Sequence, residues 1–163
     1  MFFRKYEIRT KIHMRYLFQI AILIEEQGIE FYTKLAEQSS DVNVKKLCSK
    51  LASDEAEHKK LFQDALSRWL PPPADNQSLD SLIQELKNAG LFSDEPPLDT
   101  SERDMIEYAI EQEKKTADFY LSFEKAFKHE WKRMRIQQLV MTERAHASEL
   151  ISLLSEITGQ ISP

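Results

Sequence analysis

Residues 51–62 read LASDEAEHKKLF, a stretch that is rich in charge and yet regular in its spacing. Leu51, Glu55, His58 and Phe62 follow one another at intervals of three or four residues, so they share one face of an α-helix. A leucine and a phenylalanine are typical of a face that packs into a core. The stretch therefore predicts a helix that carries a carboxylate and an imidazole on its buried side.

The same pattern returns later in the chain. TERAHASEL, at residues 142–150, places Glu143 and His146 at an offset of 143 − 55 = 88 from Glu55 and His58. A second motif has the same offset, since AILIEEQGIEFY begins at residue 21, AIEQEKKTADFY begins at residue 109, and 109 − 21 = 88. One ungapped offset that aligns two motifs indicates two copies of a helix pair, neither of which can bury its apolar stripe alone.

Helical periodicity and its stop signals divide the chain into a first helix pair at about 11–70, a connector at 71–100 and a second pair at about 101–158. Three prolines at 71–73 end the first pair, and residues 79–88 predict a short helix closed by Gly90. We predict an all-α fold, a four-helix bundle with a long crossover connection, and a single domain over residues 1–163.

Composition narrows the class of protein. With 42% apolar and 30% charged residues, the chain suits a helical domain with a real core, and its net charge of −5 argues against wholesale nucleic-acid binding. Cys48 is the only cysteine, which excludes an internal disulfide and a four-cysteine metal site and fits a reducing, cytoplasmic setting. No apolar run reaches the roughly 18 residues of a membrane span, because Arg15 and Gln19 interrupt the first one.

Each predicted helix has a polar interruption of its inner stripe. The six residues concerned are Glu25, Glu55, His58, Glu113, Glu143 and His146. Buried carboxylates must be paired, protonated or metal-bound, and no lysine or arginine lies on these stripes. Two divalent ions would balance the four carboxylate charges, and an oxygen-rich, thiol-free ligand set with two Glu-x-x-His motifs suits iron or manganese. A solvated helix face or a hydrogen-bonded core histidine explains any one of these residues, but not all six.

Other residues are predicted to support the cluster. Asp54 precedes Glu55 and could orient the imidazole of His146, whereas its counterpart in the second copy is Thr142, so the two halves are expected to differ. Tyr32 and Tyr120 lie seven residues after Glu25 and Glu113. For the two tyrosines two alternatives stay open, a hydrogen bond to a ligand carboxylate or simple packing in the core.

IEEQGIEFYTKLAE and LASDEAEHKKLF closely resemble the first helix pair of the rubrerythrin branch of the ferritin-like superfamily, and EQEKKTADFY and MTERAHASEL resemble its second pair. The resemblance covers about residues 18–157. It implies that the six residues bind two iron ions, with manganese or a mixed pair as the alternative, and that the site reacts with peroxide or O₂. It also implies that the chain can form a homodimer.

The chain departs from the family in two ways. The four-cysteine rubredoxin domain of rubrerythrins is not matched, so turnover would need a separate electron-donor protein, and Thr116 stands where the family has an extra glutamate. The sequence thus predicts a di-iron oxidoreductase that reduces peroxide or oxidises Fe²⁺ with O₂ or peroxide. The alternatives are a non-catalytic protein for iron binding, storage or sensing, and a structural bundle that has lost its site.

Overall fold

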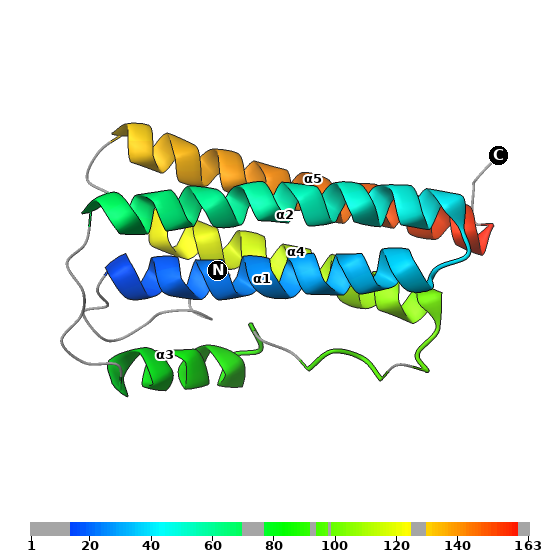
Figure 1. The fold of residues 1–163 in the computed structure, drawn as a ribbon, viewed down its shortest axis with the longest axis horizontal. Helices are drawn as coiled ribbons and strands as arrows, with labels where there is room; N and C mark the ends of the chain where they lie inside the picture. The colour runs from blue at the N-terminus through cyan, green and yellow to red at the C-terminus, as the bar shows by residue number, and fades with distance from the viewer. Residues whose placement is uncertain (1–13, 70–76, 92–93, 98, 125–129, 160–163) are drawn as a thin grey trace.

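The computed structural model describes residues 14–69, 77–91, 94–97, 99–124 and 130–159. Within these residues the chain forms the helices α1 (Met14–Gln38), α2 (Val42–Trp69), α3 (Gln77–Asn88), α4 (Glu102–Glu124) and α5 (Glu130–Thr158). Figure 1 shows α1, α2, α4 and α5 running along the long axis of the molecule, with α3 beside them. The predicted all-α four-helix bundle is confirmed.

Helix ends follow their sequence signals. The Asp41 carboxylate accepts hydrogen bonds from the backbone N–H groups of Asn43 and Val44, which makes Asp41 the N-cap of α2. Gly90 adopts a positive φ of 85° after α3, and the next backbone N–H, of Leu91, donates to the Leu86 carbonyl. This Schellman closure needs the conformational freedom of glycine. The prolines at 71–73, which are predicted to end the first helix pair, lie outside the described residues.

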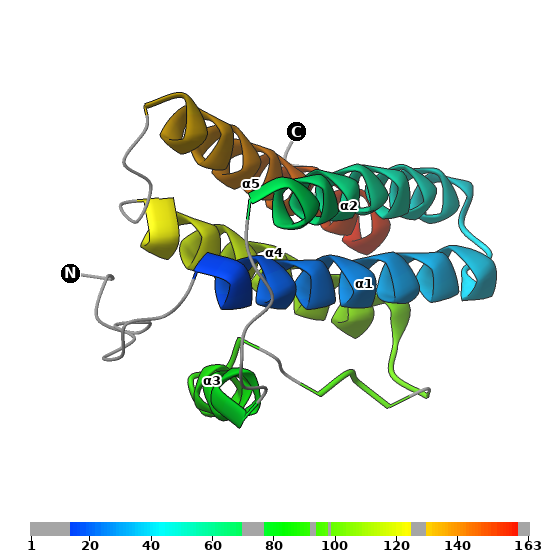
Figure 2. The same ribbon diagram turned by 60° about the vertical axis from the view of Figure 1, so that its left-hand side comes forward.

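The helices are paired as the repeat predicts. Helix α1 packs along α2 and α4 packs along α5, while contacts of α2 with α5 and of α1 with α4 join the two pairs. A turned view shows α2 and α5 in one layer and α1 and α4 in the other, with α3 outside the layer of α1 and α4 (Figure 2). The crossover after α2 therefore lets α4 run beside α1, and it leaves the connector on the α1–α4 side of the bundle.

The apolar core consists of two clusters. One includes Ile20, Phe62 and Tyr120, and the other includes Leu51 and Ile106 together with the C-terminal turns of α5. Along α1 and α2, the acidic residues of the repeat motifs fall between these clusters. The apolar clusters thus enclose the acidic residues from both ends of the bundle, which fixes their backbones and limits access of water.

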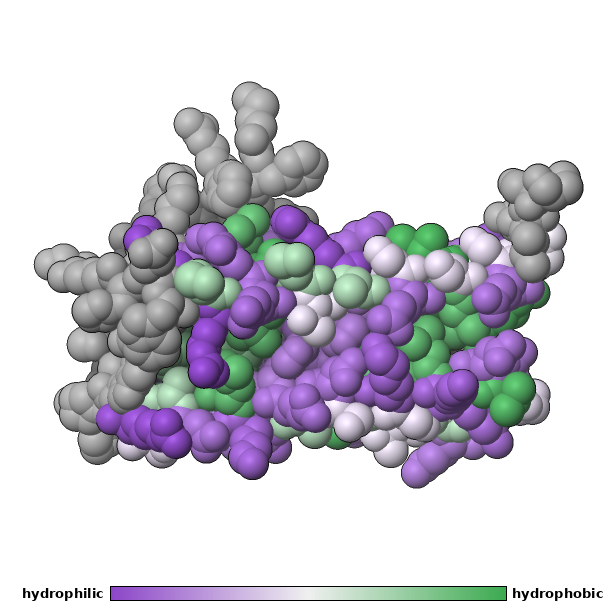
Figure 3. Space-filling model, turned by 90° about the horizontal axis from the view of Figure 1, so that it is seen from above, coloured by the Kyte–Doolittle hydropathy of each residue, from purple (hydrophilic) through white to green (hydrophobic). Residues whose placement is uncertain are grey.

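The outer surface is mainly hydrophilic on the side seen from above Figure 1, and apolar residues appear there in separate groups (Figure 3). The exposed large apolar side chains of α5 are Met134, Met141 and Ile151. No helix in the described part of the chain is long and apolar enough to cross a membrane.

Candidate metal centre

All four bundle helices contribute to one buried cluster of carboxylates and imidazoles. Its members are the predicted residues Glu25 of α1, Glu55 and His58 of α2, Glu113 of α4, and Glu143 and His146 of α5. Their burial is nearly complete, because the four glutamates have exposed fractions between 0% and 5% and only the His58 side chain reaches 12%. The structure thus brings together every residue for which the sequence predicts metal binding.

The cluster divides into two groups that share two carboxylates. Glu25, Glu55, His58 and Glu143 offer ligand atoms that lie within 4.8 Å of one another, and so do Glu55, Glu113, Glu143 and His146. Glu55 and Glu143 belong to both groups. Their position between two otherwise separate groups is the one a bridging carboxylate would occupy.

The distances from the carboxylate oxygens to the imidazole nitrogens show the same two groups. Glu143 places Oε1 at 2.9 Å from Nδ1 of His58 and Oε2 at 3.6 Å from Nδ1 of His146. Glu55 places Oε2 at 3.5 Å from Nδ1 of His58 and Oε1 at 3.3 Å from Nδ1 of His146. Each shared carboxylate therefore directs one oxygen toward each histidine, so the oxygens can serve two different centres.

The other two glutamates each approach one histidine. Glu25 Oε2 lies 3.6 Å from Nδ1 of His58, and Glu113 Oε2 lies 3.6 Å from Nδ1 of His146. The second oxygen of each accepts a hydrogen bond from the tyrosine hydroxyl of the opposite repeat: Tyr120 donates to Glu25, and Tyr32 donates to Glu113. Both tyrosines are also buried in the apolar core, so the two alternatives for these residues hold at once.

Several buried polar atoms of the cluster have no hydrogen bond. They are Oε2 of Glu25, both carboxylate oxygens of Glu143, and Nδ1 of His58 and His146. The 2.9 Å approach of Glu143 to His58 is short enough for a hydrogen bond but lacks the required angles. Unpaired buried groups are costly, and lone pairs that converge without bonding one another are the arrangement that metal ligands need. The donor set therefore fits two divalent ions.

Asp54 distinguishes the two halves of the site. Nε2–H of His146 donates to Asp54 Oδ2 at 3.1 Å, and Lys50 pairs with the same oxygen at 3.3 Å. This bond fixes the proton on Nε2 and leaves Nδ1 to face the cluster. At the equivalent position in the second repeat, the Thr142 hydroxyl donates to the backbone carbonyl of Gln138 in its own helix. The Thr142 hydroxyl therefore donates its hydrogen bond within α5, so it does not donate to His58 as a counterpart of the contact between Asp54 and His146.

Without metal, the cluster retains protons. Burial, followed by the charge of Glu55, raises the pKa of Glu25 well above its usual range, and burial likewise raises the pKa of Glu113. Burial lowers the pKa of His58, but the surrounding carboxylates, first Glu143, outweigh it and raise that pKa to about 12. Bound protons thus neutralise the carboxylates until a stronger cation replaces them.

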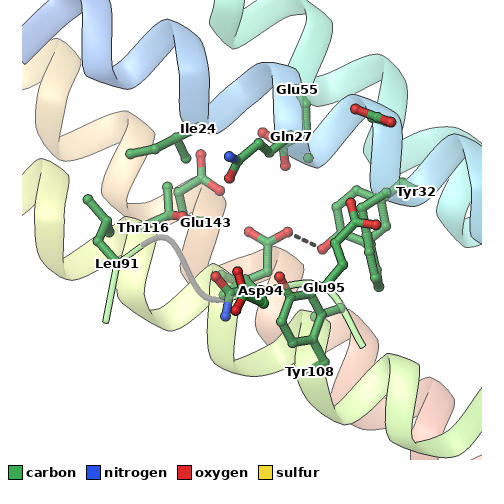
Figure 4. Close-up of a pocket in the computed structure, with 16 residues that line it drawn as sticks. Ile24, Gln27, Tyr32, Glu55, Leu91, Asp94, Glu95, Tyr108, Thr116 and Glu143 are labelled. Carbon is green, nitrogen blue, oxygen red and sulfur yellow. Dashed lines mark hydrogen bonds between the residues drawn. The ribbon is translucent and has the colours of Figure 1, made fainter. Parts of the chain in front are cut away.

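A cavity of about 290 Å³ reaches the cluster from the side of α1, α4 and the connector. Glu55, Glu113 and Glu143 line its inner end, and Thr116, at the spacing of the family's extra glutamate, lines its wall. Figure 4 shows these side chains around the cavity, together with Asp94 and Glu95 of the connector. The sequence did not predict this cavity, because the connector residues that close it follow no helical period.

Comparison with known proteins found a matching family model for the part of the chain that forms α1, α2 and α3. Residues 17–91, somewhat less than half of the chain, match the family model of rubrerythrin. Searches of curated proteins and of solved structures found no significant match. The matched segment contains Glu25, Glu55 and His58, and the internal repeat relates these residues to the other three members of the cluster.

Proposed function

We propose that the cluster binds two divalent metal ions, iron in the first place, and that the protein is a rubrerythrin-type oxidoreductase acting on peroxide or O₂. The observation that carries the proposal is the division of six buried ligands into two groups that share Glu55 and Glu143. The match of residues 17–91 to the rubrerythrin family model supports iron as the metal. Manganese or a mixed pair suits the same oxygen-rich donors.

In this proposal each residue has a defined task. His58 and His146 would each hold one ion, Glu25 and Glu113 would each add a carboxylate to one ion, and Glu55 and Glu143, which belong to both groups, would be shared between the two. Tyr120 and Tyr32 hold Glu25 and Glu113 in place by their hydrogen bonds. Since burial raises the pKa of both tyrosines, their hydroxyls keep their protons and remain donors.

Two bound ferrous ions would supply the two electrons that, with two protons, convert one H₂O₂ to two H₂O. The enclosing apolar clusters exclude bulk water, and the cavity gives a small oxidant access to the carboxylates at its inner end. Repeated turnover would need two further electrons for each peroxide. The single cysteine of these 163 residues cannot form a four-cysteine iron site, and a separate electron donor is therefore part of the proposal.

Metal analysis and rapid mixing test the proposal together. Protein reconstituted anaerobically with Fe²⁺ is expected to hold two ions per chain, and Glu143→Gln to hold fewer, whereas the exposed Glu57→Gln serves as the matched control and keeps both. Mixing the ferrous protein with H₂O₂ in a stopped-flow spectrometer should then give fast oxidation and repeated turnover with a reductant. Slow oxidation without turnover would favour storage or sensing, and a chain without bound metal would favour a structural bundle.

A further inference from the structure

We propose that divalent cations reach the metal centre through the cavity between α1, α4 and the connector, guided by the acidic side chains at its mouth. This inference rests on the proposed function, since it concerns the route to that same site. It assigns a role to Glu30, Asp94 and Glu95, none of which belongs to the cluster itself.

The mouth of the cavity carries an excess of negative charge. Glu30, Asp94 and Glu95 line the cavity and are exposed to solvent. Lys34 lies 2.8 Å from Glu30 and 3.6 Å from Glu95, so one positive charge offsets part of three negative ones. A pocket lined by one sign of charge and walled by protein concentrates the matching counter-ion and speeds its association. The mouth therefore attracts cations and repels anions.

The inner end of the cavity holds the carboxylates to which the cation would bind. Glu143 lines it with both carboxylate oxygens unpaired, although the residue is only 1% exposed. Glu55 and Glu113 lie beside it. An acidic mouth alone would be an ordinary solvated surface, but here it opens onto buried oxygens that lack partners. A hydrated cation can thus exchange its water for carboxylate oxygens along one continuous path.

Three further polar residues that line the cavity carry no charge. They are Gln27, which is exposed, Gln112, which is half-buried, and Thr116, which is buried. Their amide and hydroxyl oxygens can accept part of the coordination of a moving cation without holding it. A glutamate at position 116 would instead place a further anionic ligand in the wall. Thr116 therefore keeps this part of the route open.

The second approach to the cluster lies beside His58, whose side chain is 12% exposed. On that side, Lys59 pairs with Glu26 at 3.0 Å, which cancels the local charge. The two routes can be compared with charge variants of equal size. Asp94→Lys with Glu95→Lys alters the cavity mouth, and Glu57→Lys with Asp64→Lys alters exposed positions of α2, the helix that carries His58.

Uptake of Co²⁺ by metal-free protein, followed by its absorbance in a stopped-flow spectrometer, tests the route without any redox chemistry. The cavity-mouth variant is expected to slow uptake by roughly tenfold or more at low ionic strength, with the difference fading near 1 M salt, and to keep the same final stoichiometry. Asp94→Asn with Glu95→Gln should give a smaller change in the same direction. The α2 variant should match the wild type.

Three outcomes have distinct meanings. If wild-type protein takes up no Co²⁺, the proposed metal centre itself is refuted. If it takes up two ions and the cavity-mouth variants bind at the wild-type rate, the centre stands and the route is overturned. If the α2 variant alone is slowed, cations pass beside His58, and the cavity is left to the oxidant.

Discussion

At the residue scale, the sequence predicts which side chains form the candidate metal centre, but it does not predict the role of each. The Glu-x-x-His spacing and the repeat predict that the six residues converge, and the structure brings them together. Which carboxylates are shared depends on the angle between four helices, which no linear pattern contains. The predicted approach of Asp54 to His146 is present at 3.1 Å, because the helical offset between Asp54 and Glu55 turns Asp54 toward α5.

Removing the Asp54 carboxylate should weaken the binding of one metal ion. Asp54→Ala leaves Nε2–H of His146 without its acceptor and frees the ring to rotate, which is expected to cost roughly 10- to 100-fold in affinity for that ion. Calorimetric titration with Co²⁺ should resolve two unequal sites. Thr142→Ala, the repeat-related control, should change neither affinity much, and equal effects of the two variants would contradict the asymmetry.

Removing either tyrosine hydroxyl should destabilise the protein. Tyr32→Phe leaves a buried oxygen of Glu113 without its donor, and an unsatisfied buried group costs about 1–3 kcal/mol of unfolding free energy. Tyr120→Phe should have a similar effect through Glu25. Urea denaturation of the two variants and the wild type measures both effects. Unchanged midpoints for Tyr32→Phe and Tyr120→Phe would show that the hydroxyls are not structural donors.

At the scale of elements, the sequence predicts helices well and their contacts less well. Capping by Asp41 and closure by Gly90 rest on local chemistry and were predictable. The packing of α3 was not, because its apolar residues Leu82 and Leu86 join a core formed by distant segments. The sequence also did not predict the close approach of α1 to α2 at Gly28, because a glycine inside a helix has several explanations.

Gly28→Ala should weaken metal binding even though alanine favours helices. A Cβ atom at position 28 would meet Cγ of Glu55 at 3.2 Å, so the Glu55 side chain must shift. Helix propensity alone would stabilise α1 by up to about 1 kcal/mol. We expect metal-free stability to change little and metal affinity to fall, as measured by denaturation and Co²⁺ titration. Undiminished affinity would mean that Glu55 adjusts freely. Thr33→Ala, at an exposed position of α1 outside the cavity, controls for helix propensity.

At the scale of the whole molecule, the bundle encloses the acidic cluster between two apolar clusters, and its stability depends on the positive charge bound there. In the metal-free protein, bound protons supply that charge. His58 has a pKa of about 12 in the folded chain against about 6.5 for an ordinary histidine. The pKa values of Glu25 and Glu113 are raised as well, so the folded state binds more protons than the unfolded state above neutral pH.

The metal-free protein should therefore lose stability as pH rises. A raised folded-state pKa contributes stability that is fully present below the unfolded value and is lost toward the folded value, here between about pH 6.5 and 12 for His58. Burial raises the pKa of Glu55, but interactions with Glu25, His146 and His58 outweigh burial and lower that pKa overall. The stability that the lowered pKa contributes is fully present well below neutral pH, so it does not change between pH 7 and pH 9.5. Urea denaturation at pH 7 and pH 9.5 should show the decline, and a rise in stability would contradict it.

Anaerobic titration of metal-free protein with Fe²⁺ tests the central claim most directly. Binding is expected to saturate at two ions per chain and to release protons, and the bound ions are expected to raise the thermal unfolding midpoint until a chelator removes them. Saturation at fewer than two ions, or an unfolding midpoint that neither iron nor a chelator changes, would contradict a two-metal centre in this bundle.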